Sequence, residues 1–495
     1  MSVEISDPGA ASGALRAEVA VRSGTEDLRI FVIAAGLCWS VLFVTVGLRY
    51  GLEMYGDGAI FSYSVAVRDA WAFHWHNISG RLFVYLFSLL PAESYVALTG
   101  DARGGIALYG LSFYVAQLIG LAATFVADRS KGRIIFSYAC FSTACLCPLV
   151  FGFPTEMWMA HALFWPTLAF CHYAERGGFA LVFVALLALV FTHAGALVLI
   201  AAIFATLLLR GVRDAALIRA GRALLLVMTI WAAVHAMFPP DAYFASAVFR
   251  AALHFFDVSI LTCDLMRLLV AALAGYGAVV LLLRRRLPAH AHACAAAIVV
   301  VALAVYWLRF DHALHAENRY YLRTVMLLAM PVLGGLAAIY ALDADGRKLS
   351  VPFLSSIMGA LARAVSARAA AGAILVVMLV HAVETAKFVT AWTEYTAAVR
   401  TLAMGAASDR ALGDRNFVSS HRIGARLDPL AWFSTMPFLS VLVAPHFAPA
   451  RLVVDPTSSY FWLSCATATE NMHADRALPV QSRRLVRAYS CLHRP

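Results

Sequence analysis

The stretch IFVIAAGLCWSVLFVTVGL, residues 30–48, decides the fold class of this chain. It holds 19 residues and contains no Asp, Glu, Lys or Arg. The hydrocarbon core of a bilayer is about 30 Å thick, so a helix that crosses it needs about 20 apolar residues. The stretch therefore predicts a transmembrane helix. The polar residues before it, 1–28, lack the apolar core and cleavage site of a signal peptide, so we expect an uncleaved first span.

Similar apolar stretches continue along the chain and predict an all-α polytopic membrane protein with about 11 transmembrane helices. The stretch around His193 is divided into two short spans, because residues 192–195 (THAG) interrupt it and both flanks are cationic. The expected spans are Ile30–Leu48, Gly105–Ala127, Ile134–Phe153, Glu156–Tyr173, Phe179–Phe191, Ala194–Leu209, Ala223–Phe238, Ile260–Leu283, Ala291–Leu308, Tyr320–Leu342 and Ala370–Thr390.

The overall composition supports a membrane protein. Of the 495 residues, 62% are hydrophobic and 14% are charged, and the mean hydropathy is +0.77. Soluble chains have about 45–50% apolar and about 25% charged residues, so a soluble enzyme, a disordered tail and a fibrous repeat are excluded. The net charge of +10 comes mostly from Arg in short clusters between apolar stretches. Such clusters mark cytoplasmic loops, so we expect membrane lipids and no nucleic acid as partners.

The distribution of basic residues predicts the orientation in the membrane. With a cytoplasmic N-terminus, the inside segments hold 18 Lys and Arg, and the outside segments between the spans, up to residue 323, hold 8. This excess, which includes Arg284-Arg285-Arg286, satisfies the positive-inside rule. Richness in Arg and Ala is typical of a bacterial source. We therefore expect a multi-pass protein of the bacterial inner membrane, with a periplasmic C-terminus.

Residues 82–98 are apolar enough to suggest a further span. If they crossed the membrane, the basic segment 129–133 would lie outside. We therefore expect residues 58–98 to form one or two amphipathic helices on the outer surface, which Pro91 and Glu93 favour. A true span at 82–98 is the alternative.

The last fifth of the chain, residues 391–495, is polar and predicts a small C-terminal α+β periplasmic region that follows a transmembrane domain at 1–390. Residues 430–447 are apolar but interrupted by proline, so we expect them to pack against the membrane domain. Residues 451–455 are a candidate strand. Cys465 and Cys491 could form a disulfide in an oxidising periplasm or stay as two thiols.

The first candidate site residue lies in EMYGDG, residues 53–58, directly after the first span. A carboxylate between two glycines sits on a tight turn, where the backbone can approach a substrate closely. Asp57 is therefore a candidate general base. The alternative is a structural role, as a turn residue or as the N-cap of a helix that starts at Ala59.

A second polar cluster is WAFHWHNISGR, residues 71–81. His74 and His76 are candidate ligands of a metal or phosphate, although a spacing of two residues is a weak metal signal. Arg81 could hold a phosphate through its fork of donors. The alternative is a set of residues that anchor the chain at the membrane surface.

Two further groups complete the outer face. Glu156 opens a span, where an acidic residue favours the helix N-terminus, and His193 lies at a tight outer turn, so both have structural alternatives. The stretch DHALHAENRYYLR, residues 311–323, is the densest polar stretch beside any span. Arg323 would lie about one turn inside the membrane, where a charge is costly unless Glu317 or an anionic ligand offsets it. The alternative is a solvated loop with a snorkelling Arg.

The membrane region, about four-fifths of the chain, resembles the GT-C superfamily of integral-membrane glycosyltransferases. Three short motifs carry the resemblance: GDG at 56–58, HNISGR at 76–81 and ENRYYL at 317–322. They are similar to the first-loop acid, the Asn-Gly-Arg stretch and the Arg-Tyr-Leu run of such enzymes. The resemblance implies a GT-C-like domain at 1–390 and a sugar donor on a polyprenyl-phosphate carrier.

The resemblance also implies an inverting glycosyltransferase that acts on a glycan or lipid acceptor of the cell envelope. Asp57 would be the general base, and Arg81, Arg319 and Arg323 would stabilise the leaving phosphate. His74, His76 or His193 would orient the phosphate or a divalent cation, and no other cofactor is expected. The alternatives are a lipid or solute transporter, which would need inverted repeats and mid-span charges, and a structural membrane protein.

Overall fold

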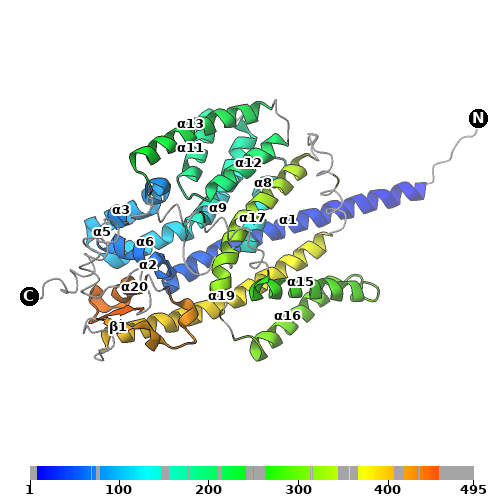
Figure 1. Ribbon diagram of the computed structural model, residues 1–495. Helices are drawn as coiled ribbons and strands as arrows, with labels where there is room; N and C mark the ends of the chain where they lie inside the picture. The colour runs from blue at the N-terminus through cyan, green and yellow to red at the C-terminus, as the bar shows by residue number, and fades with distance from the viewer. Residues whose placement is uncertain are drawn as a thin grey trace, which may run out of the picture.

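The apolar stretches fold into α-helices that lie side by side in a bundle, as the computed structural model shows (Figure 1). Described are residues 8–68, 70–73, 78–146, 155–174, 178–209, 214–240, 249, 262–312, 314, 316–343, 356, 366–405, 417–432 and 435–455. Within these ranges the side chains of 8–24, 72–73, 316–324, 343 and 417 are left out.

Eight helices of the described residues are long and apolar enough to cross a bilayer, so the chain is a multi-span helical membrane protein. Three more apolar helices have only 12 or 13 residues. The expected total of 11 spans therefore stays a prediction. The eight long helices are Thr25–Tyr50, Ser79–Thr99, Ala102–Ala127, Ala215–Met237, Asp264–Leu283, Ala291–Arg309, Val325–Leu342 and Ala367–Met404.

Each of the 11 expected stretches corresponds to helical structure over most of its described residues. These helices are α1 (Pro8–Tyr50), α6 (Ala102–Tyr114) with α7 (Ala116–Ala127), α8 (Ile134–Leu146), α9 (Glu156–His172), α11 (Phe179–Val190), α12 (Ala196–Leu208), α13 (Ala215–Met237), α15 (Asp264–Leu283), α16 (Ala291–Arg309), α17 (Ala316–Asp343) and α19 (Ala367–Met404).

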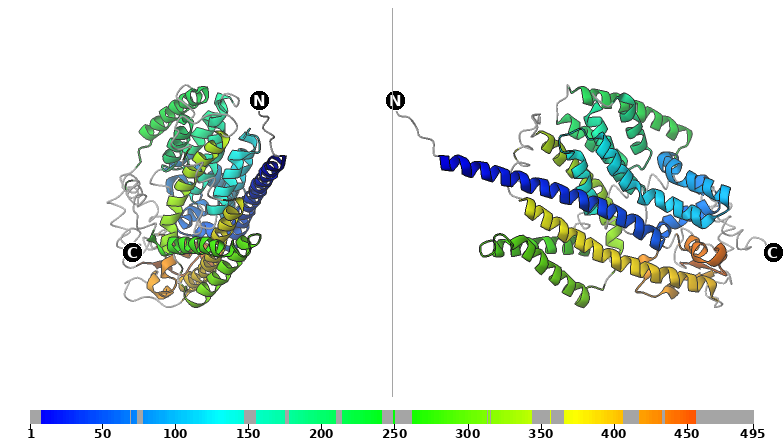
Figure 2. Two further views of the ribbon diagram at one scale, coloured as in Figure 1. Left: turned by 90° about the vertical axis from the view of Figure 1, so that its right-hand side faces the viewer. Right: turned by 180° about the vertical axis from the view of Figure 1, so that it is seen from behind.

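Small residues let the central helices approach closely. A Cβ on Gly36 of α1 would come within 2.5 Å of the Cys140 carbonyl oxygen on α8. A Cβ on Gly120 of α7 would come within 2.4 Å of the Ala162 carbonyl oxygen on α9. Close backbone approach at small residues is how helices pack in membranes, where lipid is as apolar as the side chains. The helices α11, α12 and α13 cover one side of this centre and the α15–α16 hairpin covers the opposite side (Figures 1 and 2).

The two ends of the bundle differ in character. At one end, Arg29 donates to the Gly132 carbonyl at 3.2 Å and Arg219 donates to the Ala174 carbonyl at 3.2 Å. The turn of the α15–α16 hairpin, which holds three consecutive Arg residues, lies toward this end (Figures 1 and 2). We name it the basic end. The opposite end, where α1 finishes at Tyr50 and α9 begins at Glu156, is the polar end.

A chain of short helices lies at the polar end. Ser79 donates to the Phe238 carbonyl at 3.2 Å, and the Phe83 amide donates to the Phe191 carbonyl at 3.0 Å. The stretch Ser79–Thr99 of this chain thus starts beside the C-terminal ends of α11 and α13. The elements are η1 (Leu52–Met54), α2 (Gly58–Ala66), α3 (Ala70–Phe73), η2 (Ser79–Arg81), α4 (Leu82–Val84), the π-helical η3 (Tyr85–Leu89) and α5 (Leu90–Thr99).

The stretch Ser79–Thr99 also leads directly into α6, whose residue Arg103 donates to the Ala444 carbonyl of the C-terminal region. Both ends of this run therefore lie at the polar end of the bundle, which supports the prediction of a surface helix at 58–98. Its length and hydropathy also suit a span, so its relation to the bilayer stays a prediction.

The C-terminal region contains helix and strand, as expected, and packs on the polar end (Figure 1). Strand β2 (Leu452–Val454) confirms the strand expected at 451–455, and it pairs in parallel with β1 (Phe417–Ser419). Residues expected to pack against the membrane domain do so: Phe438 of α20 (Met436–Val443) meets Tyr63, with ring centroids 5.4 Å apart. Short helices η7 (Ser420–Ile423), η8 (Asp428–Leu430) and η9 (Pro445–Phe447) complete the region.

Two further expectations for this region concern the domain boundary at residue 390 and the disulfide between Cys465 and Cys491. Helix α19 runs without a break through residue 390, the expected boundary of the transmembrane domain, and ends at Met404. Cys465 and Cys491 lie outside the described residues, so the disulfide stays a prediction.

Candidate functional site

Three glycines fold the loop that follows α1 into a tight turn. Gly51 and Gly56 have φ of +62° and +59°, a region that favours glycine because it has no Cβ. A Cβ on Gly58 would lie 2.2 Å from the carbonyl oxygen of Glu53, so only glycine fits there. The two positions that flank Asp57 therefore require glycine for different steric reasons: a positive φ at Gly56 and a close backbone contact at Gly58. Together they fix the backbone of Asp57 at the polar end.

Glu53 of this loop is buried, with 6% of its surface exposed. Its carboxylate accepts a hydrogen bond from the Tyr114 hydroxyl at 2.9 Å, and its own carbonyl accepts one from Ser62 at 3.1 Å. Burial raises the pKa of Glu53 to about 7, because a charged carboxylate is poorly solvated there. Sequence reasoning did not nominate Glu53, although its position directly after the end of a span was a usable signal.

Asp57 occupies the N-cap position of α2, where the alternative reading placed it. Its side chain, however, makes no capping hydrogen bond. The residue is half-buried, and its charge acts on the Tyr109 hydroxyl together with those of Glu53, Glu156 and Arg81. The structure therefore brings Asp57 into the same electrostatic neighbourhood as two other predicted site residues.

Arg81 and Glu156 form an ion pair, with Nη1 and Oε1 only 2.6 Å apart. Arg81 ends the short helix η2, and Glu156 is the first residue of α9, directly after Thr155, whose hydroxyl caps the helix. The side chains are 19% and 13% exposed, so the pair is partly shielded from water. Glu156 thus does more than favour a helix N-terminus: it joins two segments that lie 75 residues apart.

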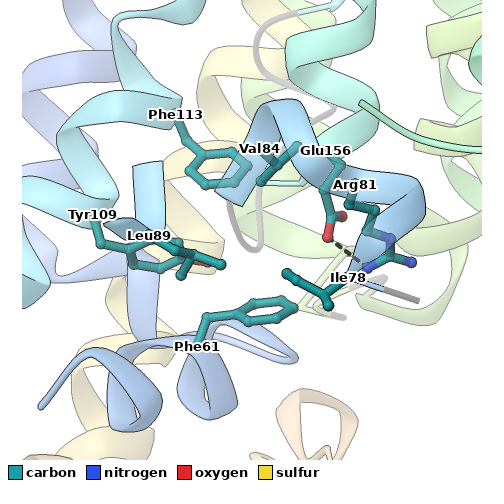
Figure 3. A pocket seen from close by; sticks show the side chains of 8 residues that line it. All are labelled: Phe61, Ile78, Arg81, Val84, Leu89, Tyr109, Phe113 and Glu156. Atoms are coloured by element: carbon teal, nitrogen blue, oxygen red, sulfur yellow. Dashed lines mark hydrogen bonds and ion pairs between the residues drawn. The ribbon is translucent and has the colours of Figure 1, made fainter. Parts of the chain in front are cut away.

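A narrow hollow lies beside this ion pair. Arg81 and Glu156 are its charged lining residues, and Tyr109 reaches into it from α6 (Figure 3). The other lining residues are apolar: Phe61, Ile78, Val84, Leu89 and Phe113. The space between these side chains is too narrow for a water molecule, so they lie packed against one another.

His193 lies close to this region through the backbone. Its Nδ1 accepts a hydrogen bond from the Gly195 amide at 3.0 Å, which shapes the turn between α11 and α12. That turn touches the segment of Arg81, because Phe191 accepts the Phe83 amide hydrogen. The local hydrogen bond supports the structural alternative for His193, and its role with phosphate stays a prediction.

The chain matches no protein-family model, no curated protein and no solved structure. Its function must therefore be inferred from the arrangement of its own residues.

Several predicted site residues lie beyond what the structure describes. His74 and His76 fall outside the described residues. Glu317, Arg319 and Arg323 lie in the first turns of α17, but their side chains are left out. Arg319 and Arg323 are four positions apart, so both lie on one face of that helix.

A second charged cluster, which the sequence did not indicate as a site, joins α19 to the loop before α17. Lys387 lies 3.2 Å from Asp311 and 3.1 Å from Glu384. Each carboxylate is 3% exposed and the ammonium is 18% exposed. The spacing of Glu384 and Lys387 on one helix face was visible in the sequence, whereas their contact with Asp311 depends on the tertiary fold.

The question of a metal stays open in the sequence prediction. Over the described ranges, no three or more His, Cys, Asp or Glu residues gather in a way that could hold a metal ion. The charged groups at the hollow are one guanidinium and its partner carboxylate, so the arrangement suits hydrogen bonding to a polar ligand.

Proposed function

We propose that this protein is an inverting membrane glycosyltransferase that moves a sugar from a polyprenyl-phosphate carrier to an envelope glycan or lipid. The observation that carries the proposal is that the Arg81–Glu156 pair lines a hollow at the polar end of the bundle, and that the charge of Asp57 acts on Tyr109, which lines the same hollow. A lipid-linked donor lies in the bilayer with its headgroup at the surface, so a site at one end of the bundle suits it. The GT-C resemblance of the sequence agrees with this placement.

In the proposed reaction, an acceptor hydroxyl attacks the anomeric carbon of the donor sugar. Asp57 takes the hydroxyl proton as the new carbon–oxygen bond forms, and the bond from the anomeric carbon to the phosphate oxygen breaks. The polyprenyl phosphate leaves with the electron pair of that bond. Attack from the opposite side inverts the configuration at the anomeric carbon.

The departing phosphate gains charge and needs fixed cations close by. Arg81, Arg319 and Arg323 are the candidates, and His74, His76 or His193 would orient the phosphate or a divalent cation. Asp57 suits the base role because the surrounding glycines fix its backbone at the polar end. The proposed orientation places the polar end in the periplasm of a bacterial inner membrane, where envelope acceptors lie.

The test is mass spectrometry of envelope glycans and glycolipids in a deletion strain that carries wild type, Asp57→Asn or no copy. We expect Asp57→Asn to lower transfer by about 10²–10⁴-fold, because a general base contributes that much. Loss of the same sugar mass in the deletion and the variant supports the proposal. Full activity of Asp57→Asn would overturn the base assignment.

A matched control is Asp101→Asn. Asp101 is exposed and caps α6 by accepting the Gly104 amide hydrogen, a role that Asn also fills. We expect this variant to transfer sugar as wild type does. An unchanged glycan profile in the deletion strain itself would contradict the proposed glycosyltransferase activity.

A transporter of a lipid or solute is the second candidate, and one observation favours it. The cluster around Lys387 lies midway along α19, one of the long apolar helices, and ionisable groups inside a membrane domain often mark a transport path. Unchanged envelope glycans in the deletion strain, together with unchanged polyprenyl-linked intermediates, would favour this candidate.

A further inference from the structure

The side chain of Glu53 fits closely against α6. A Cβ on Gly110 of that helix would lie 2.8 Å from the Glu53 Cβ and 3.1 Å from its Oε2, so glycine makes room for this carboxyl. One turn further along α6, the Tyr114 hydroxyl donates to Oε2 at 2.9 Å. Tyr114 is itself buried against α1, where a Cβ on Gly47 would lie 2.6 Å from its ring. Glu53 therefore has a specific contact site on α6.

The backbone of Glu53 holds the start of α2, which lies beside α6 (Figure 1). The buried Ser62 hydroxyl donates to the Glu53 carbonyl at 3.1 Å. A Cβ on Gly58 would lie 2.2 Å from the same oxygen, so the first residue of α2 packs directly on it. Asp57 is the N-cap of α2 and lies between these contacts in the chain. The contact of Glu53 with α6 therefore determines where the candidate base lies.

The surroundings of this carboxyl favour its neutral form. The elements packed most closely on η1 are α1, α2 and α6, and the titratable side chains near the turn are Arg49, Tyr50, Asp57, Tyr63, Tyr109 and Tyr114. Arg49 is exposed and lies over the Tyr50 ring, 5.6 Å from its centre. Among the described residues no basic side chain pairs with Glu53. Burial therefore raises the pKa of Glu53 to about 7, so the carboxyl is neutral at pH 5 and mostly ionised at pH 8.

We propose that Glu53 is a positioning residue: its neutral carboxyl holds the Asp57 loop on α6, and ionisation of that carboxyl loosens the contact. The inference rests on the proposed function and adds regulation by pH to it. A neutral carboxyl suits buried surroundings, whereas a carboxylate gains solvation only by moving toward water, and the loop moves with it. Transfer should therefore decline as the pH rises through about 7.

The first measurement is hydrogen exchange of the backbone amides of residues 51–59. Full-length wild type and Glu53→Gln are compared in lipid nanodiscs at pH 5, 6, 7 and 8. The ratio of their exchange rates at each pH removes the intrinsic pH dependence of exchange, and Gln is neutral throughout. We expect the ratio of wild type to variant to rise about tenfold or more from pH 5 to pH 8, because ionisation favours the loosened loop. A ratio that does not change with pH would overturn the inference.

The second measurement is the pH profile of transfer in permeabilised membranes of the deletion strain that carry either protein. Transfer is read as the gain of the sugar mass that the deletion lacks. About one tenth of a carboxyl with a pKa of about 7 is neutral at pH 8, so wild type should transfer about tenfold more slowly at pH 8 than at pH 6. Glu53→Gln should keep its rate over this interval. Equal profiles for the two proteins, at whatever rate, would leave Glu53 with a structural role alone and overturn the inference.

Two further variants support the comparison. The matched control is Glu93→Gln at the same end of the bundle, where the half-buried Glu93 carboxylate accepts the Ala70 amide hydrogen at 2.5 Å. It should keep the wild-type exchange and pH profile. Tyr114→Phe keeps the ring that packs on Phe43 but removes the donor to Glu53, so it tests the contact if Glu53→Gln does not fold. Its loop should exchange about tenfold faster than that of wild type at pH 8, the loss of one hydrogen bond. Exchange as slow as in wild type would contradict the inference.

The outcomes separate this inference from the proposed function. If the deletion removes a sugar but the exchange ratio is flat, or the two proteins share one pH profile, the positioning role of Glu53 fails and the transferase proposal stands. If the deletion removes no sugar, the transferase proposal fails, and the positioning role fails with it.

Discussion

Two charged clusters of this protein use the same chemistry to different ends. The Arg81–Glu156 pair has balanced charge and lines a hollow. The Lys387 cluster has two carboxylates for one ammonium, and both carboxylates are almost fully buried. The balanced pair joins the start of α9 to the short helix η2 at the edge of the hollow. In the Lys387 cluster one ammonium bridges two buried carboxylates, so its first role is to hold α19 against the loop before α17.

The largest effect should come from Lys387→Met. Removal of one partner of a buried ion pair is strongly destabilising, and here two buried carboxylates would lose the same ammonium. We expect the free energy of unfolding to fall by about 3–5 kcal/mol. Denaturant titration in detergent micelles, followed by tryptophan fluorescence, measures this loss.

The control for Lys387 is Arg267→Met on α15. Arg267 pairs with Asp264 at 3.3 Å, but their side chains are 69% and 64% exposed. An exposed pair contributes about 0–1 kcal/mol, so this variant should unfold almost as wild type does. The combined variant Lys387→Met, Asp311→Asn, Glu384→Gln should recover most of the loss, since no unpaired charge remains. Equal stability of Lys387→Met and Arg267→Met would refute the contrast.

The pH dependence of stability should reveal Glu53, a carboxyl without a basic partner at its oxygens in the described structure. Its pKa rises from 4.5 in the unfolded chain to about 7 in the fold. Its favourable contribution is therefore complete below pH 4.5 and is lost as the pH rises through about 7. Between these values we expect wild type to lose about 3 kcal/mol of stability.

Glu53→Gln should remove this slope, because the amide is neutral at every pH and still accepts the Tyr114 hydrogen. Unfolding titrations at pH 5, 6, 7 and 8 test it, with Glu26→Gln, an exposed carboxyl on α1, as the control. A wild-type slope that persists in Glu53→Gln would assign the titration to another group.

A smaller loss of stability, but a large loss of transfer, should follow from Arg81→Met. The partly shielded Glu156 loses a charged hydrogen bond, which costs about 1.5–3 kcal/mol. Transfer should fall by about 10²–10³-fold if Arg81 holds the donor. The glycan assay measures the loss of transfer, and the unfolding titration measures the loss of stability. A variant that loses stability but keeps transfer would move Arg81 to the same structural role as Lys387.

Hydropathy alone predicted the class of the fold, because a bilayer sets both the length and the composition of a span. It could not decide how many stretches cross. Helices such as α11 have 12 residues, and Ser79–Thr99 has the length of a span although both its ends lie at the polar end of the bundle. The strand at Leu452–Val454 was predictable from its β-branched residues, but its partner β1 was not.

The site was predictable in its members and less so in its contacts. Arg81 and Glu156 were both singled out, but 75 residues separate them and only the fold pairs them. Asp57 could be singled out in the sequence because glycines flank it. The structure shows the steric reason why each of these two positions is glycine. Tyr109 gave no signal, because a tyrosine in an apolar helix reads as core until its hydroxyl is found without a partner.

Helix α19 has 38 residues and fixes a long distance within the molecule. An unbroken helix of that length measures about 57 Å, nearly twice the thickness of the hydrocarbon core. Its far end holds the C-terminal region, and on the way Trp392 donates to the last carbonyl of α1 at 3.0 Å. One rigid helix thereby sets the distance between the C-terminal region and the Asp57 loop. In the proposed transferase, this distance would limit the size of the acceptor. A helical turn inserted or deleted beyond Trp392 would change it by about 5.4 Å.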